Sequence, residues 1–167
     1  MSPTRHRVAA LHGKISIHEV LETVIALDTA AHDFYLKLAP KISKRIRYLV
    51  EELAAEEEQH IRKFKELATR PDLVEVIKTE IECNCDDSQF SDALHMPDLG
   101  EHPDDQDVLH FALGREQMAM EHYTELALKT PPGPIRDLFI YLRDEETRHK
   151  IDLEKKYYEL VHRGGGV

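Results

Sequence analysis

The chain has 167 residues, which is long enough to form one domain with its own core and without disulfide or metal staples. Its 32 acidic and 22 basic residues give a formal charge of −10, which argues against nucleic-acid binding and suits a protein that attracts cations. No apolar run approaches the roughly 18 residues of a membrane span.

The first residues, MSPTRHRVAALHG, are basic, but their apolar core VAAL is too short for a signal peptide. The two cysteines, Cys83 and Cys85, lie too close together to form a disulfide framework. We therefore expect a cytoplasmic protein. Two ordinary loop thiols are the first interpretation of the cysteine pair, and a metal-binding or redox role is the alternative.

Four long segments carry the signals of amphipathic helices. The first opens with the capping box Ser16-x-x-Glu19 and stops near Pro40, and the second ends before Pro71. Pro134 follows a Pro-Pro-Gly turn and is well placed to start the last helix. The expected helices cover about residues 16–39, 43–69, 106–129 and 134–162.

The connection 70–105 separates the second helix from the third. Its first part, about 71–81, fits a short helix, and the remainder is acidic and interrupted by Pro97, Gly100 and Pro103, as in a long loop. No segment shows a convincing strand pattern. The sequence therefore predicts a single all-α domain, an antiparallel four-helix bundle with a long middle connection.

The first and third helices repeat each other at an offset of 88 residues, as from Asp28 to Glu116. Both show one apolar stripe at helical spacing, interrupted by a carboxylate at matching depth. The stripe of the first helix is Leu21, Val24, Asp28, Ala31, Tyr35 and Leu38. That of the third is Leu109, Ala112, Glu116, Ala119, Tyr123 and Leu126.

The second and fourth helices repeat in the same way at an offset of 89 residues, and each places Glu-x-x-His in its stripe. These pairs are Glu57 with His60 and Glu146 with His149. A third Glu-x-x-His, Glu159 with His162, has no counterpart in the other half, and we interpret it as a surface pair. The chain thus contains one helical hairpin twice.

Buried carboxylates in a bundle seam would each cost several kcal/mol without compensation. Two divalent cations would supply a charge of +4 against the −4 of Asp28, Glu57, Glu116 and Glu146. The i, i+3 spacing places each Glu and His on one helix face, so that the Glu can bridge two metals and the His can bind one. Mixed oxygen and nitrogen ligands with open positions suit iron or manganese better than structural zinc.

A carboxylate followed seven residues later by Tyr, then EExxH, with the whole pattern repeated, resembles the ferritin-like di-iron carboxylate superfamily and within it the rubrerythrins. The resemblance covers about residues 16–162. It implies a ferritin-like bundle and a di-iron centre whose metals lie roughly 3–4 Å apart. The implied metal ligands are Asp28, Glu57, His60, Glu116, Glu146 and His149, with Tyr35 and Tyr123 beside the centre.

The chain departs from the rubrerythrin pattern at three places. Asp28 is one methylene shorter than the Glu of the family, and His32, one turn further on, is an additional candidate ligand. Ala119 stands where rubrerythrins proper carry a further carboxylate. The rubredoxin module with its two Cys pairs has no equivalent beyond Cys83 and Cys85.

The resemblance implies an oxidoreductase in which peroxide or dioxygen oxidises two Fe(II) ions, with a role in peroxide scavenging or oxidative stress. A separate protein would donate electrons, and we expect a homodimer. Two alternatives stay open: a ferroxidase or iron-storage protein, and a non-enzymatic metal-binding bundle. Manganese or zinc could replace the iron.

Overall fold

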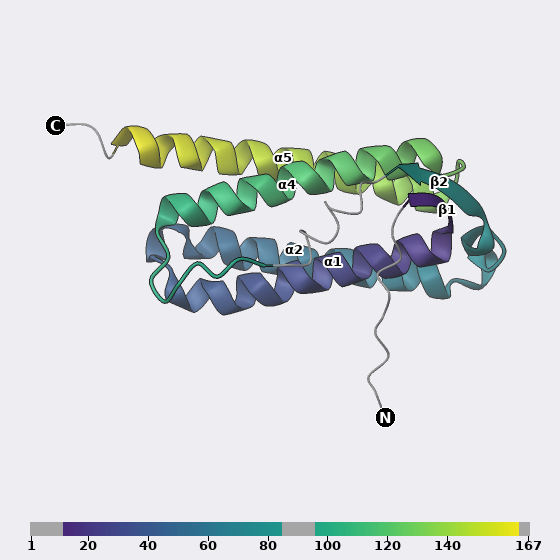
Figure 1. The fold of residues 1–167 in the computed structure, drawn as a ribbon, viewed down its shortest axis with the longest axis horizontal. Helices are drawn as coiled ribbons and strands as arrows, with labels where there is room; N and C mark the ends of the chain where they lie inside the picture. Colours follow the sequence, from purple (N-terminus) through teal and green to yellow (C-terminus); the bar gives the residue numbers. More distant parts are fainter. Residues whose placement is uncertain (1–11, 85–95, 164–167) are drawn as a thin grey trace, which may run out of the picture.

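The structure is a computed structural model and describes residues 12–84 and 96–163. Its four long helices are α1 (Ile17–Leu38), α2 (Lys44–Thr69), α4 (Asp105–Lys129) and α5 (Pro134–Arg163). Helix α1 packs against α2 and α4 packs against α5, and the two hairpins lie alongside each other (Figure 1). This arrangement confirms the expected all-α bundle of two hairpins.

The helix boundaries follow the signals in the sequence. Ser16 and Glu19 form the expected capping box, in which each side chain accepts a hydrogen bond of 3.2 Å from the backbone N–H of the other. At the start of α4 the Asp104 carboxylate accepts from the N–H of Gln106 at 2.7 Å. Pro134 begins α5 as expected.

Residues 71–81 do not form the short helix that the sequence suggested. Two 3₁₀ turns, Pro71–Leu73 and Val76–Lys78, are followed by strand β2 (Glu80–Asn84). Strand β2 pairs antiparallel with β1 (His12–Ser16), so the expectation of no strand was also wrong. The pairing is explained by alternation: Ile81 faces Ile15 across the ladder and both are buried, whereas Glu80 and Glu82 are exposed.

The small sheet lies at one end of the bundle, and α4 begins at the opposite end (Figure 1). Cys83 belongs to β2, so it is not a loop residue as expected, and Cys85 lies outside the described residues. Residues 96–104 lead into α4 without helix or strand, in agreement with the predicted loop.

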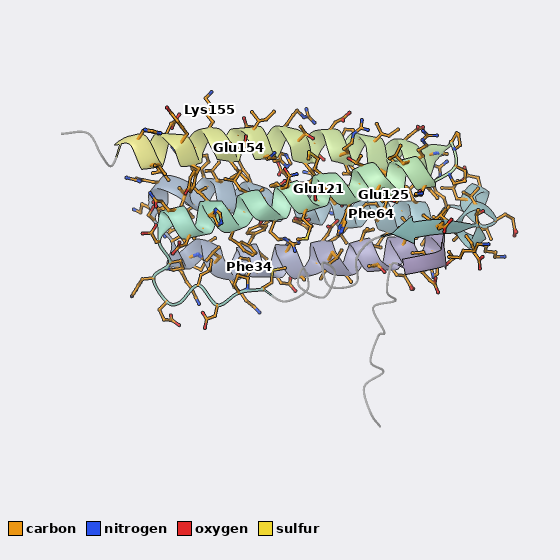
Figure 2. All side chains as sticks on the ribbon, turned by 45° about the horizontal axis from the view of Figure 1, so that its top comes forward. Phe34, Phe64, Glu121, Glu125, Glu154 and Lys155 are labelled. Carbon is orange, nitrogen blue, oxygen red and sulfur yellow. The ribbon has the colours of Figure 1, made fainter. Side chains whose placement is uncertain are left out.

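The apolar core consists of two clusters, one towards each end of the bundle. Phe64, Tyr123 and Phe139 form the aromatic part of one cluster, with ring centroids 6.1–6.2 Å apart. Phe34 and Phe111, whose ring centroids are 4.8 Å apart, pack against the other cluster. Figure 2 labels Phe34 and Phe64, which lie at different positions along the bundle axis.

The switch from one cluster to the other falls at the same depth in every helix. In α1 it falls between Leu27 and Ala31, and in α4 between Ala112 and Tyr123. In α2 and α5 it falls between Ala54 and Phe64 and between Leu142 and Leu153. A polar layer therefore crosses the middle of the core. Over the described ranges, no helix is both long and apolar enough to span a bilayer.

Candidate metal centre

The polar layer contains all six side chains that the sequence singled out as metal ligands. Each helix contributes through the face that its apolar stripe turns inward. The side chains form two groups, and within each group one potential ligand atom per residue lies within 4.8 Å of the others: Asp28, Glu57 and His60; Glu116, Glu146 and His149. The predicted convergence is therefore present, and the role of these residues as ligands stays a prediction.

Glu146 belongs to the second group and also faces His60 of the first. Its Oε1 is 3.4 Å from Nδ1 of His60, and its Oε2 is 3.9 Å from Nδ1 of His149. His149 Nδ1 is also 3.5 Å from Oε2 of Glu116, and His60 Nδ1 is 3.8 Å from Oε2 of Glu57. One carboxylate thus faces both imidazoles, as a bridging ligand would.

Each imidazole turns its other nitrogen to a glutamate of the opposite hairpin. Nε2 of His60 lies 3.0 Å from Oε2 of Glu145, and Nε2 of His149 lies 2.9 Å from Oε1 of Glu56. A carboxylate at Nε2 favours the tautomer that leaves the Nδ1 lone pair directed at the centre. Neither Glu56 nor Glu145 was predicted from the sequence, although each directly precedes a predicted ligand.

The surroundings of these two outer glutamates differ. Beside Glu145, the Lys63 ammonium lies 4.2 Å from the ring centroid of Tyr141. Beside Glu56, a cavity of about 100 Å³ is lined by Glu52, Asp152 and His149. A cation and a tyrosine ring therefore lie beside Glu145, whereas Glu56 borders a cavity lined by leucine and acidic side chains.

The two tyrosines lie where the sequence predicted but have different contacts. The Tyr123 hydroxyl donates to Oδ2 of Asp28 at 3.3 Å. The Tyr35 hydroxyl is buried and has no hydrogen-bond partner among the described residues. Burial raises the pKa of both phenols well above its usual value, and the next cause is Glu116 for Tyr35 and Asp28 for Tyr123.

Without metal, Asp28, Glu57 and Glu146 bind protons strongly. Burial, and then the charge of Glu146, raises the pKa of Asp28 to about 8. Burial, and then the charge of Glu116, raises the pKa of Glu146 to about 8. Burial, and then the charge of Asp28, raises the pKa of Glu57 well above its usual value. Crowded carboxylates in a low-dielectric layer cannot all ionise without cations.

For the two imidazoles, burial and the neighbouring charges act on the pKa in opposite directions. Burial by itself lowers the pKa of His60, but the hydrogen bond with Glu145 and the charges of Glu146 and Glu57 outweigh it, and the net pKa is raised. Burial is likewise outweighed at His149, where the nearby carboxylates of Glu116, Glu146 and Glu56 raise the pKa to about 12. Protons on both histidines would compensate part of the negative charge of the metal-free layer.

Two atoms of the layer test whether it fits a metal ion. Nδ1 of His60 and Oε2 of Glu116 are buried and have no hydrogen-bond partner among the described residues. Such atoms cost free energy unless something binds them, and both are ordinary ligand atoms for a divalent cation. The six side chains therefore fit a pair of divalent metals.

The remaining candidates lie elsewhere. His32 Nδ1 is 3.1 Å from Oδ1 of Asp33, next to it in the chain, and neither ligand group includes His32. A ligand role for His32 thus has no support in this geometry. Near the end of α5, Glu159 pairs with Lys156 at 3.6 Å and the His162 ring lies 4.0 Å from that of Tyr158. Both belong to the surface, as predicted.

An antiparallel four-helix bundle with a carboxylate and histidine layer of this kind belongs to the ferritin-like class of folds. The chain belongs to the rubrerythrin family, because the Rubrerythrin family model matches residues 19–157. A solved structure from Thermotoga maritima, described as a ferritin-like diiron-carboxylate protein, is similar over 89% of this chain and 98% of that chain, with a TM-score of 0.66 and 19% identity. That similarity concerns the fold. The comparison with curated proteins gives no match.

Proposed function

We propose that the protein is a di-iron oxidoreductase in which peroxide or dioxygen oxidises two Fe(II) ions. The observation that carries the proposal is Glu146, whose two oxygens face the Nδ1 atoms of His60 and His149, one in each ligand group. Family membership and the buried, unpartnered His60 Nδ1 support a binuclear metal site.

Iron bound there would supply two electrons, which with two protons reduce one peroxide to two water molecules. The chain itself provides the rest. Asp28, Glu57 and Glu116 would hold the two metal positions together with Glu146, and the two histidines would each bind one position. Glu56 and Glu145 fix the imidazoles, and the Tyr123 hydroxyl orients Asp28.

We further propose that the electrons that restore Fe(II) come from a separate donor protein, that the protein works in the cytoplasm, and that it forms a homodimer. The donor and the homodimer follow from the rubrerythrin resemblance, and the cytoplasmic setting follows from the two closely spaced cysteines, which form no disulfide framework. A donor is needed because the resemblance offers no rubredoxin module within this chain.

Metal-free protein titrated anaerobically with Fe(II) tests the central proposal. We expect two ions per chain, followed by fast oxidation of both when peroxide or dioxygen is added separately. Glu146→Gln should lose at least one ion, whereas Glu154→Gln, an exposed position on the same helix (Figure 2), should bind both. Many irons per chain would instead indicate storage, and two bound ions inert to both oxidants would indicate a structural metal site.

A further inference from the structure

A small cavity lies between α1 and α4, directly beside the candidate centre. Its volume is about 30 Å³, and a single water molecule needs roughly 10–15 Å³ on this measure, so a molecule of two or three heavy atoms fits. Its wall includes Asp28, Arg115, Met118, Ala119, His122 and Tyr123. The cavity therefore joins one predicted ligand to a cationic side chain.

The internal repeat shows that this cavity is specific to one half of the molecule. At the offset of 88 residues, His122 corresponds to Phe34, and Thr23 corresponds to Phe111. Phe34 and Phe111 pack ring to ring at 4.8 Å, and Phe34 also packs edge-on against Tyr35 at 5.8 Å. Aromatic rings thus fill the seam between α1 and α4 beside Tyr35, whereas His122 and the cavity lie beside Tyr123.

The cavity wall also contains one cationic side chain, Arg115. Arg115 corresponds in the repeat to Leu27, and both side chains line this cavity, so its wall combines one guanidinium with apolar groups. Burial and then Arg115 lower the pKa of His122 to about 4, so His122 is neutral near pH 7 and Arg115 is the cation. Ala119 contributes only a methyl group and leaves room between Arg115 and the centre.

Asp28 would repel an anion in this cavity, and the metal pair removes that obstacle. Two divalent cations offset the four carboxylates of the layer, and the guanidinium then gives the cavity a positive wall. We propose that the cavity binds a small anion of two or three heavy atoms beside the metal position of Asp28, with Arg115 as its counter-ion. The inference rests on the proposed function only in requiring two bound metals.

Zinc-loaded protein titrated with azide and formate by calorimetry tests this inference without any redox step. We expect both anions to bind. Propionate, with five heavy atoms, should not bind. Arg115→Gln should weaken azide binding by about tenfold or more, the usual worth of a charge-assisted hydrogen bond. Ala119→Leu should abolish binding by filling the cavity.

Arg45→Gln is the matched control, because it makes the same substitution at an exposed arginine that pairs with Asp105 at 3.6 Å and lies outside the cavity wall. It should leave azide affinity unchanged. Zinc content and melting temperature are measured for every variant, and Ala119→Val replaces the leucine variant if that one does not fold. Equal weakening by Arg115→Gln and Arg45→Gln, or full azide affinity in the filled variant, would overturn the inference.

The two proposals can fail separately. Two bound zinc ions without azide binding would remove the anion site and leave the proposed oxidoreductase untouched. Azide binding with the expected variant pattern, but iron that neither peroxide nor dioxygen oxidises, would support the anion site and refute the proposed oxidoreductase.

Discussion

At the scale of single residues, adjacent glutamates have different tasks. Glu57 and Glu146 face the centre, and their neighbours Glu56 and Glu145 each meet a histidine of the other hairpin. Neighbouring positions on a helix point about 100° apart, so one glutamate enters the seam and the other reaches its edge. The EE pair therefore joins the two hairpins and also supplies a candidate metal ligand.

Glu145→Gln should weaken metal binding at the His60 position by roughly 10–100-fold, the usual effect of removing a carboxylate partner from a metal-binding histidine. Metal titration followed by calorimetry measures the two affinities. Glu58→Gln is the control, since Glu58 is exposed and pairs with Arg62 at 2.8 Å. Equal losses in both variants would show that the change follows total charge and not the His60 contact.

The two tyrosines give a second prediction at this scale. Tyr123→Phe removes a hydrogen bond to buried Asp28 and should destabilise the metal-free protein by about 1 kcal/mol. Tyr35→Phe removes a buried hydroxyl without a hydrogen-bond partner and should be neutral or slightly stabilising. Urea denaturation of both variants compares them directly. A larger loss for Tyr35→Phe would contradict the assigned contacts.

At the scale of elements, the helices were predictable because their signals are local. The capping box of Ser16 and Glu19, Pro134 at the start of α5 and the apolar stripes all act within a few residues. The strands were not predictable in this way. Ile15 meets Ile81 across a whole helical hairpin, and each five-residue strand alone is too short to show a pattern.

The residues of the candidate site also differ in whether the local sequence reveals them. Six ligand candidates followed from periodicity and from the repeat, because a carboxylate within an apolar stripe is conspicuous. Arg115 and His122 gave no such signal, since Arg115 directly precedes Glu116 and resembles a solvated charge. The difference between His122 and Phe34 was visible in the repeat and was the one available clue.

Ile81→Ala tests the role of the small sheet. Ile81 is buried against the end of the bundle, so its truncation should cost about 2–4 kcal/mol of unfolding free energy. Val76→Ala, at an exposed position nearby, should cost much less. Because the sheet lies at the end of the bundle, metal stoichiometry should stay the same in both variants. A changed stoichiometry in Ile81→Ala would show that the sheet positions the centre.

At the scale of the whole molecule, the core consists of two apolar clusters with a charged layer between them. The apolar clusters favour folding through burial, and the metal-free layer opposes it through desolvated charge. Solution conditions that change the charge of the layer should therefore change the stability of the entire bundle.

The metal-free protein should become less stable as the pH rises. Asp28 and Glu146 have folded pKa values of about 8 against 3.8 and 4.5 for ordinary groups, so between about pH 4 and 8 the folded state binds more protons than the unfolded state. His149, raised from 6.5 to about 12, adds stability below 6.5 that is lost as the pH rises further. Urea midpoints at pH 5, 7 and 9 should decrease in that order.

Replacing both Glu57 and Glu146 by Gln provides the control for this pH series. The double variant keeps the size of the side chains but removes two groups that bind protons, so its urea midpoint should depend much less on pH. Metal affinity of the wild type should run the other way and increase with pH, because the metals must displace these protons. A wild-type midpoint that rises from pH 5 to 9 would contradict the raised carboxylate pKa values.

Each hairpin carries half of the centre: one carboxylate, one Glu-x-x-His pair and one outer glutamate that serves the opposite histidine. The two hairpins are therefore arranged like the two subunits of a twofold symmetric dimer, but within one polypeptide. A single hairpin pairing with a second copy of itself would already assemble a complete set of ligands. Because both copies lie in one chain, the halves need not be identical, and they differ between Phe34 and His122 and between Leu27 and Arg115.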